Sequence, residues 1–271
     1  MKKNYKISII GTGKIGTAIA NGLLESGEFD IPNITLADLN VTKLNVMKEK
    51  GFKITGNNID AVKKSDIIII SVEPHHANQV FEEIRNDLNP EKHTLISVVT
   101  GFKIDHIKSK ICNDTDIIRV MPNTAVAVRE SMTCIAFNNV KESSKERVAS
   151  IFDTVGETVI ISEELMPAAT ALCACGTAFF MRAVRAASQG GIEVGFHSEI
   201  AISMAAQTAK GAAKLILSKG RHPEFEIDKV TTPMGCTIAG LNRMEHEGFS
   251  SSIIKGITTS AKKASELGKT K

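Results

Sequence analysis

The chain has 271 residues, of which 42% are hydrophobic and 23% are charged, and its formal net charge is +3. This composition is typical of a folded chain of about two domains and argues against disorder. The small net charge, the scattered basic residues and the scarcity of aromatic side chains (one Tyr and no Trp) also argue against a nucleic-acid partner.

The first part of the chain alternates short β-branched runs with helical patterns. Residues 5–11 predict a strand, and residues 14–26 predict a helix because apolar side chains recur there at helical spacing. Further strands are predicted at 34–38, 52–55, 66–72, 94–99 and 116–122, and weaker ones at the sheet edge at 132–137 and 158–162. Repeated strand and helix indicate an α/β fold over residues 1–162, a Rossmann-type doubly wound parallel sheet with helices on both faces.

The turn between the first strand and the first helix contains Gly11, Gly13 and Gly16 in the spacing G-x-G-x-x-G. Between a strand and a helix this motif is typical of dinucleotide binding. Gly11 permits a tight turn, Gly13 lets a pyrophosphate approach the backbone, and Gly16 lets the helix pack on the strand. The alternative is a tight turn without a ligand. The predicted cofactor site also takes in the other residues of the turn, Thr12, Lys14 and Ile15.

Asp38 ends the second predicted strand. A carboxylate at this place accepts hydrogen bonds from both ribose hydroxyls and repels a 2′-phosphate, which favours NADH over NADPH. No Arg follows Asp38 directly, although Lys43 is close in sequence. The alternative role of Asp38 is to cap the next helix.

Helical patterns replace strand patterns after Ser162, and an all-helical domain is predicted over residues 163–271. Its helices are expected near 163–188, 198–218, 236–247 and 250–267. Ser162 is a candidate N-cap, and Glu163 in the first turn suits the helix dipole. Long helices rich in Ala, Gly and Ser bury their apolar faces poorly alone, so we expect a homodimer formed through this domain.

The five cysteines, which include the C-x-C pair Cys173 and Cys175, lack the spacing of a disulfide framework or a zinc site. We interpret them as reduced, buried thiols and expect no metal. The apolar run near the N-terminus is too short for a signal peptide, and no apolar window is expected to reach the length of a membrane span. These features predict a cytoplasmic protein with no membrane partner.

Four segments resemble, in order and over nearly the whole chain, those of one enzyme family, pyrroline-5-carboxylate reductase. They are ISIIGTGKIGTAIANGLL (7–24), RVMPNT (119–124), AAQTAKGAAKLIL (205–217) and HPEFEIDKVTTPMGCTIAGL (222–241). The resemblance implies an enzyme that reduces a small cyclic imine, L-1-pyrroline-5-carboxylate, to L-proline with NADPH or NADH, the last step of proline biosynthesis. It also implies a Rossmann domain, a helical dimerisation domain, and often a larger ring of dimers.

The resemblance assigns further site residues by matching position. It implies that Asn58 lies near the adenosine ribose and that Asn123 contacts the nicotinamide and the substrate. The turn after the fourth strand is placed beside the cofactor, with Val72, Glu73 and Pro74. A loop contributed across the dimer is implied to hold the substrate carboxylate and ring nitrogen, with Thr232, Gly235, Cys236 and Thr237.

The sequence departs from the family pattern in three places. Glu73 replaces the lysine of a usual V-K-P turn, residues 173–179 read CACGTAF where S-G-S-G-P-A-Y is usual, and residues 231–237 read TTPMGCT where T-S-P-G-G-T-T is usual. These departures fall in predicted cofactor and substrate segments, so they bear on the shape of the pocket.

The chemistry of imine reduction fits these residue types. A protonated iminium is already electrophilic, so positioning the two reactants matters more than supplying a strong acid. Thr237 is the candidate catalytic residue through a hydrogen bond to the ring nitrogen, and N–H groups at the start of the helix predicted at 236–247 suit the carboxylate. The alternatives are a capping role for Thr237 and a turn role for Asn123. His222 fits a helix cap better than a general acid.

Two other functions stay open at this stage. A β-hydroxyacid dehydrogenase shares the layout, but it needs a catalytic lysine on the first long helix of the second domain, and residues 163–188 contain no Lys. A dinucleotide-binding regulator without catalysis is the other, because the changed segments 173–179 and 231–237 lie where the chemistry is expected.

Overall fold

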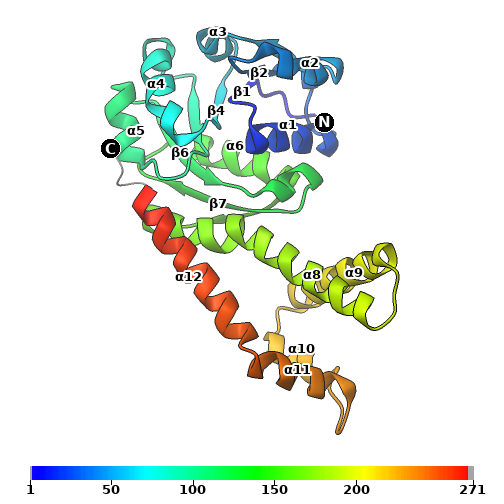
Figure 1. Ribbon diagram of the computed structural model, residues 1–271. Helices are drawn as coiled ribbons and strands as arrows, with labels where there is room; N and C mark the ends of the chain where they lie inside the picture. The colour runs from blue at the N-terminus through cyan, green and yellow to red at the C-terminus, as the bar shows by residue number, and fades with distance from the viewer. Residues whose placement is uncertain (1, 268–271) are drawn as a thin grey trace. The chain divides into compact units, whose positions relative to one another are not determined.

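The computed structural model describes residues 2–267. They form two compact units, coloured along the chain in Figure 1. The first unit runs to Cys175 and resumes at Ser260, and the second unit is Gly176–Thr259.

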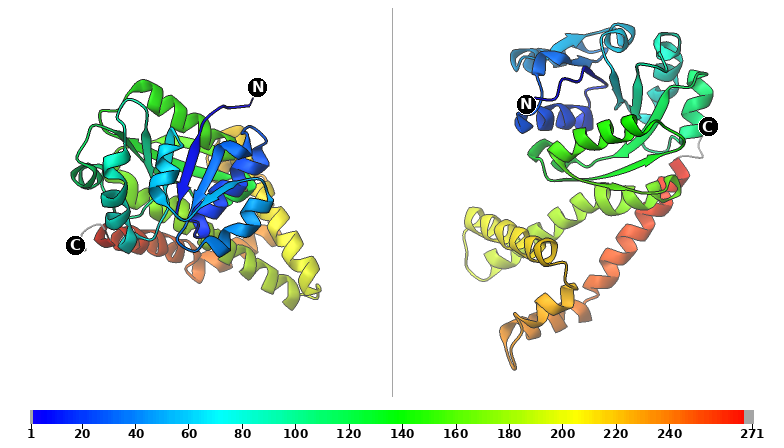
Figure 2. Two further views of the ribbon diagram at one scale, coloured as in Figure 1. Left: turned by 90° about the horizontal axis from the view of Figure 1, so that it is seen from above. Right: turned by 180° about the vertical axis from the view of Figure 1, so that it is seen from behind.

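The first unit is built on an eight-stranded sheet with the order β3-β2-β1-β4-β5-β6-β7-β8. Figure 2 shows the ribbon from two further sides. Its strands are β1 (Ile7–Ile10), β2 (Ile34–Ala37), β3 (Lys53–Thr55), β4 (Ile67–Ile70), β5 (Thr94–Ser97), β6 (Asp116–Met121), β7 (Ser131–Phe137) and β8 (Gly156–Ile160). All eight correspond to predicted strands, and the two weaker ones do extend one edge. The pairing is parallel except between β6 and β7, which are antiparallel.

Helices cover both faces of the sheet, which confirms the predicted doubly wound fold. One face packs against α1 (Lys14–Ser26), α2 (Val41–Glu49) and α6 (Glu142–Phe152). The other face packs against α3 (Asn58–Lys63), α4 (Pro74–Ile84) and α5 (Ile104–Ile111). Every residue of β1, β2, β4 and β5 is buried, as expected for apolar strands covered on both sides.

The strand order reverses direction between β1 and β4. From β1 the chain moves outward to β2 and β3, and it then returns to place β4 on the other side of β1. In an open parallel sheet, ligands bind in the crevice outside the carboxyl ends of the strands at such a reversal. The fold therefore directs attention to the residues that follow Ile10 and Ile70.

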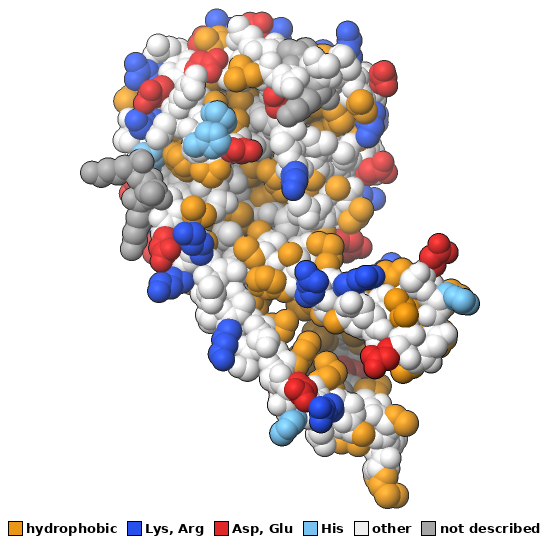
Figure 3. All heavy atoms as spheres, in the orientation of Figure 1, with side chains coloured by type: hydrophobic (Ala, Val, Ile, Leu, Met, Phe, Trp, Pro, Cys, Tyr) orange, Lys and Arg blue, Asp and Glu red, His pale blue; other side chains and the backbone are white. Residues whose placement is uncertain are grey.

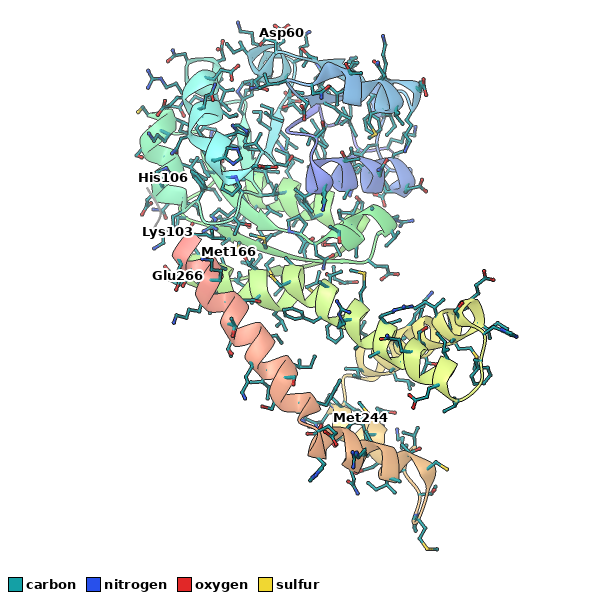
Figure 4. All side chains as sticks on the ribbon, in the orientation of Figure 1. Asp60, Lys103, His106, Met166, Met244 and Glu266 are labelled. Carbon is teal, nitrogen blue, oxygen red and sulfur yellow. The ribbon has the colours of Figure 1, made fainter. Side chains whose placement is uncertain are left out.

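The segment directly after β8 packs on the sheet. It comprises η5 (Glu163–Leu165), α7 (Met166–Ala169) and a π-helical turn, Thr170–Cys175. Met166, labelled in Figure 4, is buried among Met121, Cys134 and Ala136 of β6 and β7. The sheet unit consequently continues past the domain boundary predicted after Ser162.

The structure modifies two local expectations for this segment. Ser162 occupies the N-cap position of η5, but its side chain makes no capping hydrogen bond. The helix predicted over 163–188 is present within one continuous helical segment, Glu163–Glu193, but its hydrogen-bonding type changes along the chain, through η5, α7, the π-helical turn and α8 (Gly176–Glu193). The carboxylate of Glu163 is bound to Arg119 and to the N–H of Ile104, so its role is more than an interaction with the helix dipole.

The second unit is helical, as predicted. It contains α8, α9 (Ser198–Lys219), α10 (Pro223–Asp228), α11 (Cys236–His246) and the first part of α12 (Phe249–Leu267). The short α10 is absent from the prediction. A Cβ added at Gly191 would lie 3.3 Å from the Cβ of Ala201, so these two small residues let α8 and α9 approach closely.

Large apolar side chains of the second unit are widely exposed. Figure 3 shows hydrophobic side chains on the surface of its helices, and Phe180, Val194 and Leu217 are 69%, 77% and 80% exposed. The helical segment Glu163–Glu193, 31 residues long, is long and apolar enough to cross a membrane by length and composition alone. The expectation that no segment reaches that length is therefore wrong.

Candidate functional site

A cavity of about 360 Å³ lies at the carboxyl ends of β1, β2 and β4, at the reversal in strand order. It brings together six of the predicted cofactor residues: Gly11, Gly13, Asp38, Asn58, Val72 and Glu73. The other predicted residues of the glycine turn and the following turn do not line it: Thr12, Lys14, Ile15, Gly16 and Pro74.

The glycine turn has the geometry that its spacing predicts. Gly11 has φ +93°, which favours glycine, and a Cβ at Gly11 would lie 2.8 Å from the backbone at Ser71 and Val72. A Cβ at Gly16 would collide with the carbonyl oxygen of Gly11 and approach the Oγ of Ser71 to 2.6 Å. A Cβ at Gly13 would meet nothing within 4 Å. Two of the glycines are therefore required by packing, and Gly13 faces open space.

The amino end of α1 is suited to an anion. Gly13 is its N-cap residue, and no side chain caps the helix. The first N–H groups of a helix have no partner within the helix, and the helix dipole adds partial positive charge there. A phosphate that reached Gly13 would receive these hydrogen bonds without displacing a protein group.

The carboxylate of Asp38 joins the glycine turn to the end of β2. Its Oδ2 accepts hydrogen bonds from the backbone N–H and the Oγ1 of Thr12, at 2.9 and 2.7 Å. Its Oδ1 accepts one from the N–H of Asn40 at 2.9 Å. Asn40, not Asp38, is the N-cap residue of α2. Asp38 therefore supports the turn and still presents a half-buried carboxylate to the cavity.

The cavity carries several acidic side chains and, among the described residues of its wall, no Lys or Arg. Asp38, Glu73 and Glu83 line it. Asn58, which is buried, donates a hydrogen bond from Nδ2 to Oε2 of Glu83 at 2.9 Å. The side chain of Lys43 lies outside the described residues.

Sequence reasoning missed the contribution of α4 to this wall. His76, Gln79, Val80 and Glu83 line the cavity together with Glu73 at the N-cap of α4. Positions 73, 76, 80 and 83 follow helical spacing, so they form one stripe along the helix. That spacing was the signal that could have found them.

Asn123 follows β6 and organises the next turn. Its Oδ1 accepts a hydrogen bond from the N–H of Ala125 at 2.9 Å and caps η3 (Thr124–Val128). Its Nδ2 donates to the carbonyl oxygen of Cys173 at 3.2 Å. Asn123 is buried and does not line the cavity, so its turn role is confirmed, whereas its contact with a ligand stays a prediction.

The predicted substrate loop belongs to the second unit and leads into α11. Gly235 is the N-cap residue of α11, and no side chain caps this helix either. A Cβ at Gly235 would collide with the Oγ1 of Thr232, so the turn requires glycine at this position. Thr237 lies in the first turn of α11 and is exposed, as are Thr232 and Cys236. Their contact with a substrate stays a prediction.

Two further expectations are tested locally. His222 is the N-cap residue of α10, and its Nδ1 accepts a hydrogen bond from the N–H of Glu224 at 3.3 Å, which confirms its capping role. The cysteines are not all buried, because Cys112 and Cys236 are exposed. Among residues 2–267, no cluster of three or more His, Cys, Asp or Glu side chains could hold a metal ion.

Family models of known proteins match both parts of the chain. A family model described as pyrroline-5-carboxylate reductase dimerisation matches residues 163–267, and one described as NADP oxidoreductase coenzyme F420-dependent matches residues 6–101.

Relatives over the full chain carry one name. The chain is 47% identical to pyrroline-5-carboxylate reductase 1 of Dictyostelium discoideum, over 96% of this chain but 49% of that protein. It is 46% identical to pyrroline-5-carboxylate reductase 2 of the same organism, over 98% of this chain and 94% of that protein. A crystal structure of Plasmodium falciparum pyrroline carboxylate reductase with NADP bound has a TM-score of 0.88 and 25% identity, and it covers 99% of this chain and 100% of that one.

Proposed function

The chain belongs to the pyrroline-5-carboxylate reductase family, and from this premise we propose that it reduces L-1-pyrroline-5-carboxylate to L-proline with NADH or NADPH. The observation that carries the proposal is the cavity at the carboxyl ends of β1 and β4, where an uncapped helix start and Asp38 meet. The chain is accordingly an NAD(P)H-dependent oxidoreductase that acts on a carbon–nitrogen double bond.

The residues of the cavity fit a dinucleotide. The open space at Gly13 would hold the pyrophosphate, and the N–H groups at the start of α1 would donate hydrogen bonds to it. The hydroxyls of the adenosine ribose would donate hydrogen bonds to the carboxylate of Asp38, with Asn58 nearby. The bound cofactor supplies the hydride that reaches the imine carbon.

The residues of the substrate loop fit a small carboxylated imine. The N–H groups at the start of α11, at Cys236 and Thr237, are oriented to bind a carboxylate. The hydroxyl of Thr237 holds the ring nitrogen, which ends the reaction protonated. Thr232, Cys236 and Thr237 are exposed in a single chain. Their side chains are therefore available to a ligand and to a second subunit in an assembled dimer.

The helical region, residues 163–271, is the proposed dimerisation and substrate-binding domain, and residues 1–162 are the dinucleotide-binding domain. The exposed apolar side chains of the second unit, Phe180 and Leu217 among them, support association of two chains. The same association accounts for the apolar segment Glu163–Glu193 without a membrane. A ring of such dimers and a cytoplasmic location stay predictions.

Purified protein tests the proposal directly. We expect oxidation of NADH or NADPH, followed at 340 nm, when pyrroline-5-carboxylate is added, with one proline formed per cofactor consumed. Turnover of a 3-hydroxy acid but not of the imine would point to a β-hydroxyacid dehydrogenase. Cofactor binding without turnover of either substrate would point to a regulator.

Thr237→Ala is expected to lower kcat/KM for the imine. The loss of transition-state stabilisation should be about 1.5–3 kcal/mol, the scale of one hydrogen bond to a charged group. Thr258→Ala is the matched control, because the hydroxyl of Thr258 is bonded to the carbonyl oxygen of Ile254 in its own helix. Steady-state kinetics of both variants with the same cofactor give the comparison. Equal kcat/KM for Thr237→Ala and the unmodified enzyme would remove Thr237 from the mechanism.

A further inference from the structure

Two cysteine side chains face each other within the first unit. Cys134 lies on β7 and is 3% exposed, and Cys173 lies in the π-helical turn Thr170–Cys175 and is half-buried. Their Sγ atoms are 3.8 Å apart and share a hydrogen bond. Neither sulfur is part of a disulfide, and the same holds for Cys112, Cys175 and Cys236.

We propose that Cys134 and Cys173 form a reversible disulfide when the enzyme meets a peroxide, and that this bond displaces the Asn123 turn and lowers activity. The disulfide is a property of the two cysteines alone. The effect on activity rests on the proposed function. Disulfides in a reducing compartment are typically transient and redox-sensing, which is the use inferred here.

The surroundings of Cys134 and Cys173 differ, and they give the two sulfurs different chemical roles. A hydrogen bond from the Cys134 thiol lowers the pKa of Cys173 to about 7, so much of Cys173 is thiolate at neutral pH. The same hydrogen bond and burial raise the pKa of Cys134, which therefore stays protonated. Cys173, the more exposed of the two, is the attacking sulfur, and Cys134 is the resolving one.

The reaction balances with the peroxide as the only oxidant. The Cys173 thiolate attacks one peroxide oxygen, the O–O bond breaks, and protonation of the leaving oxygen releases water and leaves a sulfenic acid. The sulfur of Cys134 then attacks the Cys173 sulfur, the S–OH bond breaks, and the hydroxyl leaves as water with the proton of Cys134. Two thiols lose two electrons in total, and the peroxide becomes two waters.

Closing the bond requires movement, and the surrounding structure decides which side moves. The sulfurs must approach from 3.8 Å to about 2.05 Å. Cys134 sits on a strand that is paired on both sides, with β6 and with β8. Cys173 sits in a single π-helical turn, a form of helix that is rare and often found at functional sites. The displacement therefore falls on Thr170–Cys175.

That displacement reaches the predicted nicotinamide loop through one hydrogen bond. The carbonyl oxygen of Cys173 accepts the Nδ2 of Asn123 at 3.2 Å, and the Oδ1 of Asn123 caps the turn that begins at Thr124. Moving Cys173 toward β7 breaks or redirects this bond. A misplacement of about 1 Å at a reacting site can cost on the order of 100-fold in rate, so a small shift is sufficient.

Peptide mapping tests the disulfide. Reduced enzyme is treated with hydrogen peroxide, alkylated and digested with trypsin, which places Cys134 in peptide 130–141 and Cys173 in peptide 148–182. We expect these two peptides to be crosslinked and two hydrogens lighter. Because peptide 148–182 also contains Cys175, the digest is repeated with Cys175→Ser, which should leave the crosslink intact. A crosslink that disappears in Cys175→Ser would overturn the proposal.

Activity and pH give the second readout. We expect activity with pyrroline-5-carboxylate to fall at least about tenfold on oxidation and to return with dithiothreitol. Cys134→Ala should leave a sulfenic acid at Cys173 that dimedone traps, and Cys112→Ser should behave as the unmodified enzyme. The rate of crosslinking should rise between pH 6 and pH 8, with the growing thiolate fraction of Cys173.

The outcomes separate this inference from the proposed function. An active reductase whose two peptides stay unlinked under peroxide overturns the disulfide and leaves the function intact. A complete crosslink with unchanged activity overturns the link to Asn123. A crosslink in a protein that lacks imine reduction supports the disulfide and counts against the proposed function.

Discussion

Replacing Asp38 with serine is expected to raise the ratio of kcat/KM for NADPH to kcat/KM for NADH by about 10- to 100-fold. Hydrogen bonds to a charged group are worth about 1.5–3 kcal/mol, which corresponds to this range, and NADH loses them with the carboxylate. NADPH gains in the same variant, because its 2′-phosphate no longer meets a negative charge in a cavity whose described wall contains Glu73 and Glu83 but no Lys or Arg.

The supporting role of Asp38 has to be separated from its role toward the cofactor. Asp38 accepts two hydrogen bonds from Thr12 and one from Asn40, so a variant can also disturb the glycine turn. Asp38→Asn keeps an oxygen acceptor for the turn and removes the charge, and we expect it to shift the ratio in the same direction by less. Asp105→Ser, on the exposed first turn of α5, is the control for a lost surface carboxylate.

Kinetics with both cofactors at several concentrations check this expectation. A variant that loses the same factor with NADH and with NADPH would mean that Asp38 only holds the turn and does not discriminate between cofactors. If the unmodified enzyme prefers NADPH, a cation that is not among the described wall residues must lie near the cavity.

The sequence predicted the sheet and the glycine turn because both depend on local signals. Apolar runs with β-branched residues locate strands such as β4 and β5, and the helix at 14–26 follows from one repeating face. The glycine spacing predicts backbone geometry directly: Gly11 needs a positive φ, and Gly16 allows no side chain. Such requirements act within a few residues, so they are readable without knowledge of the tertiary contacts.

Long-range pairing is the part that the sequence left open. Glu163 looked like an ordinary first-turn acid, but its partners are Arg119 and Ile104, more than forty residues earlier. Cys134 and Cys173 meet only because α7 and the π-helical turn fold back on β7. Neither the π-helical turn nor α10 has a periodic pattern long enough to be distinguished from the helices around it.

Glu163→Ala is expected to lower the free energy of unfolding by about 3–5 kcal/mol, because it breaks a buried ion pair by removing one partner. Oε1 of Glu163 lies 2.9 Å from Nη1 of Arg119, and the two side chains are 9% and 7% exposed. The same oxygen accepts the N–H of Ile104 at 2.7 Å. The alanine variant therefore buries an unpaired guanidinium and leaves the N–H at the start of α5 without its acceptor.

The adjacent residue supplies a matched control. Glu164 is exposed, so Glu164→Ala should change the free energy of unfolding by less than about 0.5 kcal/mol. Urea unfolding at one fixed protein concentration measures both variants, since association of subunits would otherwise shift the midpoint. If both variants lose a similar amount of unfolding free energy, the ion pair between Glu163 and Arg119 makes no specific contribution to stability.

Two further variants divide the ion pair into its parts. Glu163→Gln retains an oxygen for the N–H of Ile104 but removes the negative charge. The amount by which it lowers the free energy of unfolding more than Glu164→Ala does therefore measures the cost of leaving the charge of Arg119 unpaired. The double variant Arg119→Met with Glu163→Leu removes both charges, and replacing a buried pair by apolar side chains of similar volume is often neutral or stabilising. We expect it to unfold at higher urea than Glu163→Ala. If it does, the main contribution of Glu163 is to neutralise a cation that the fold has already buried beneath η5.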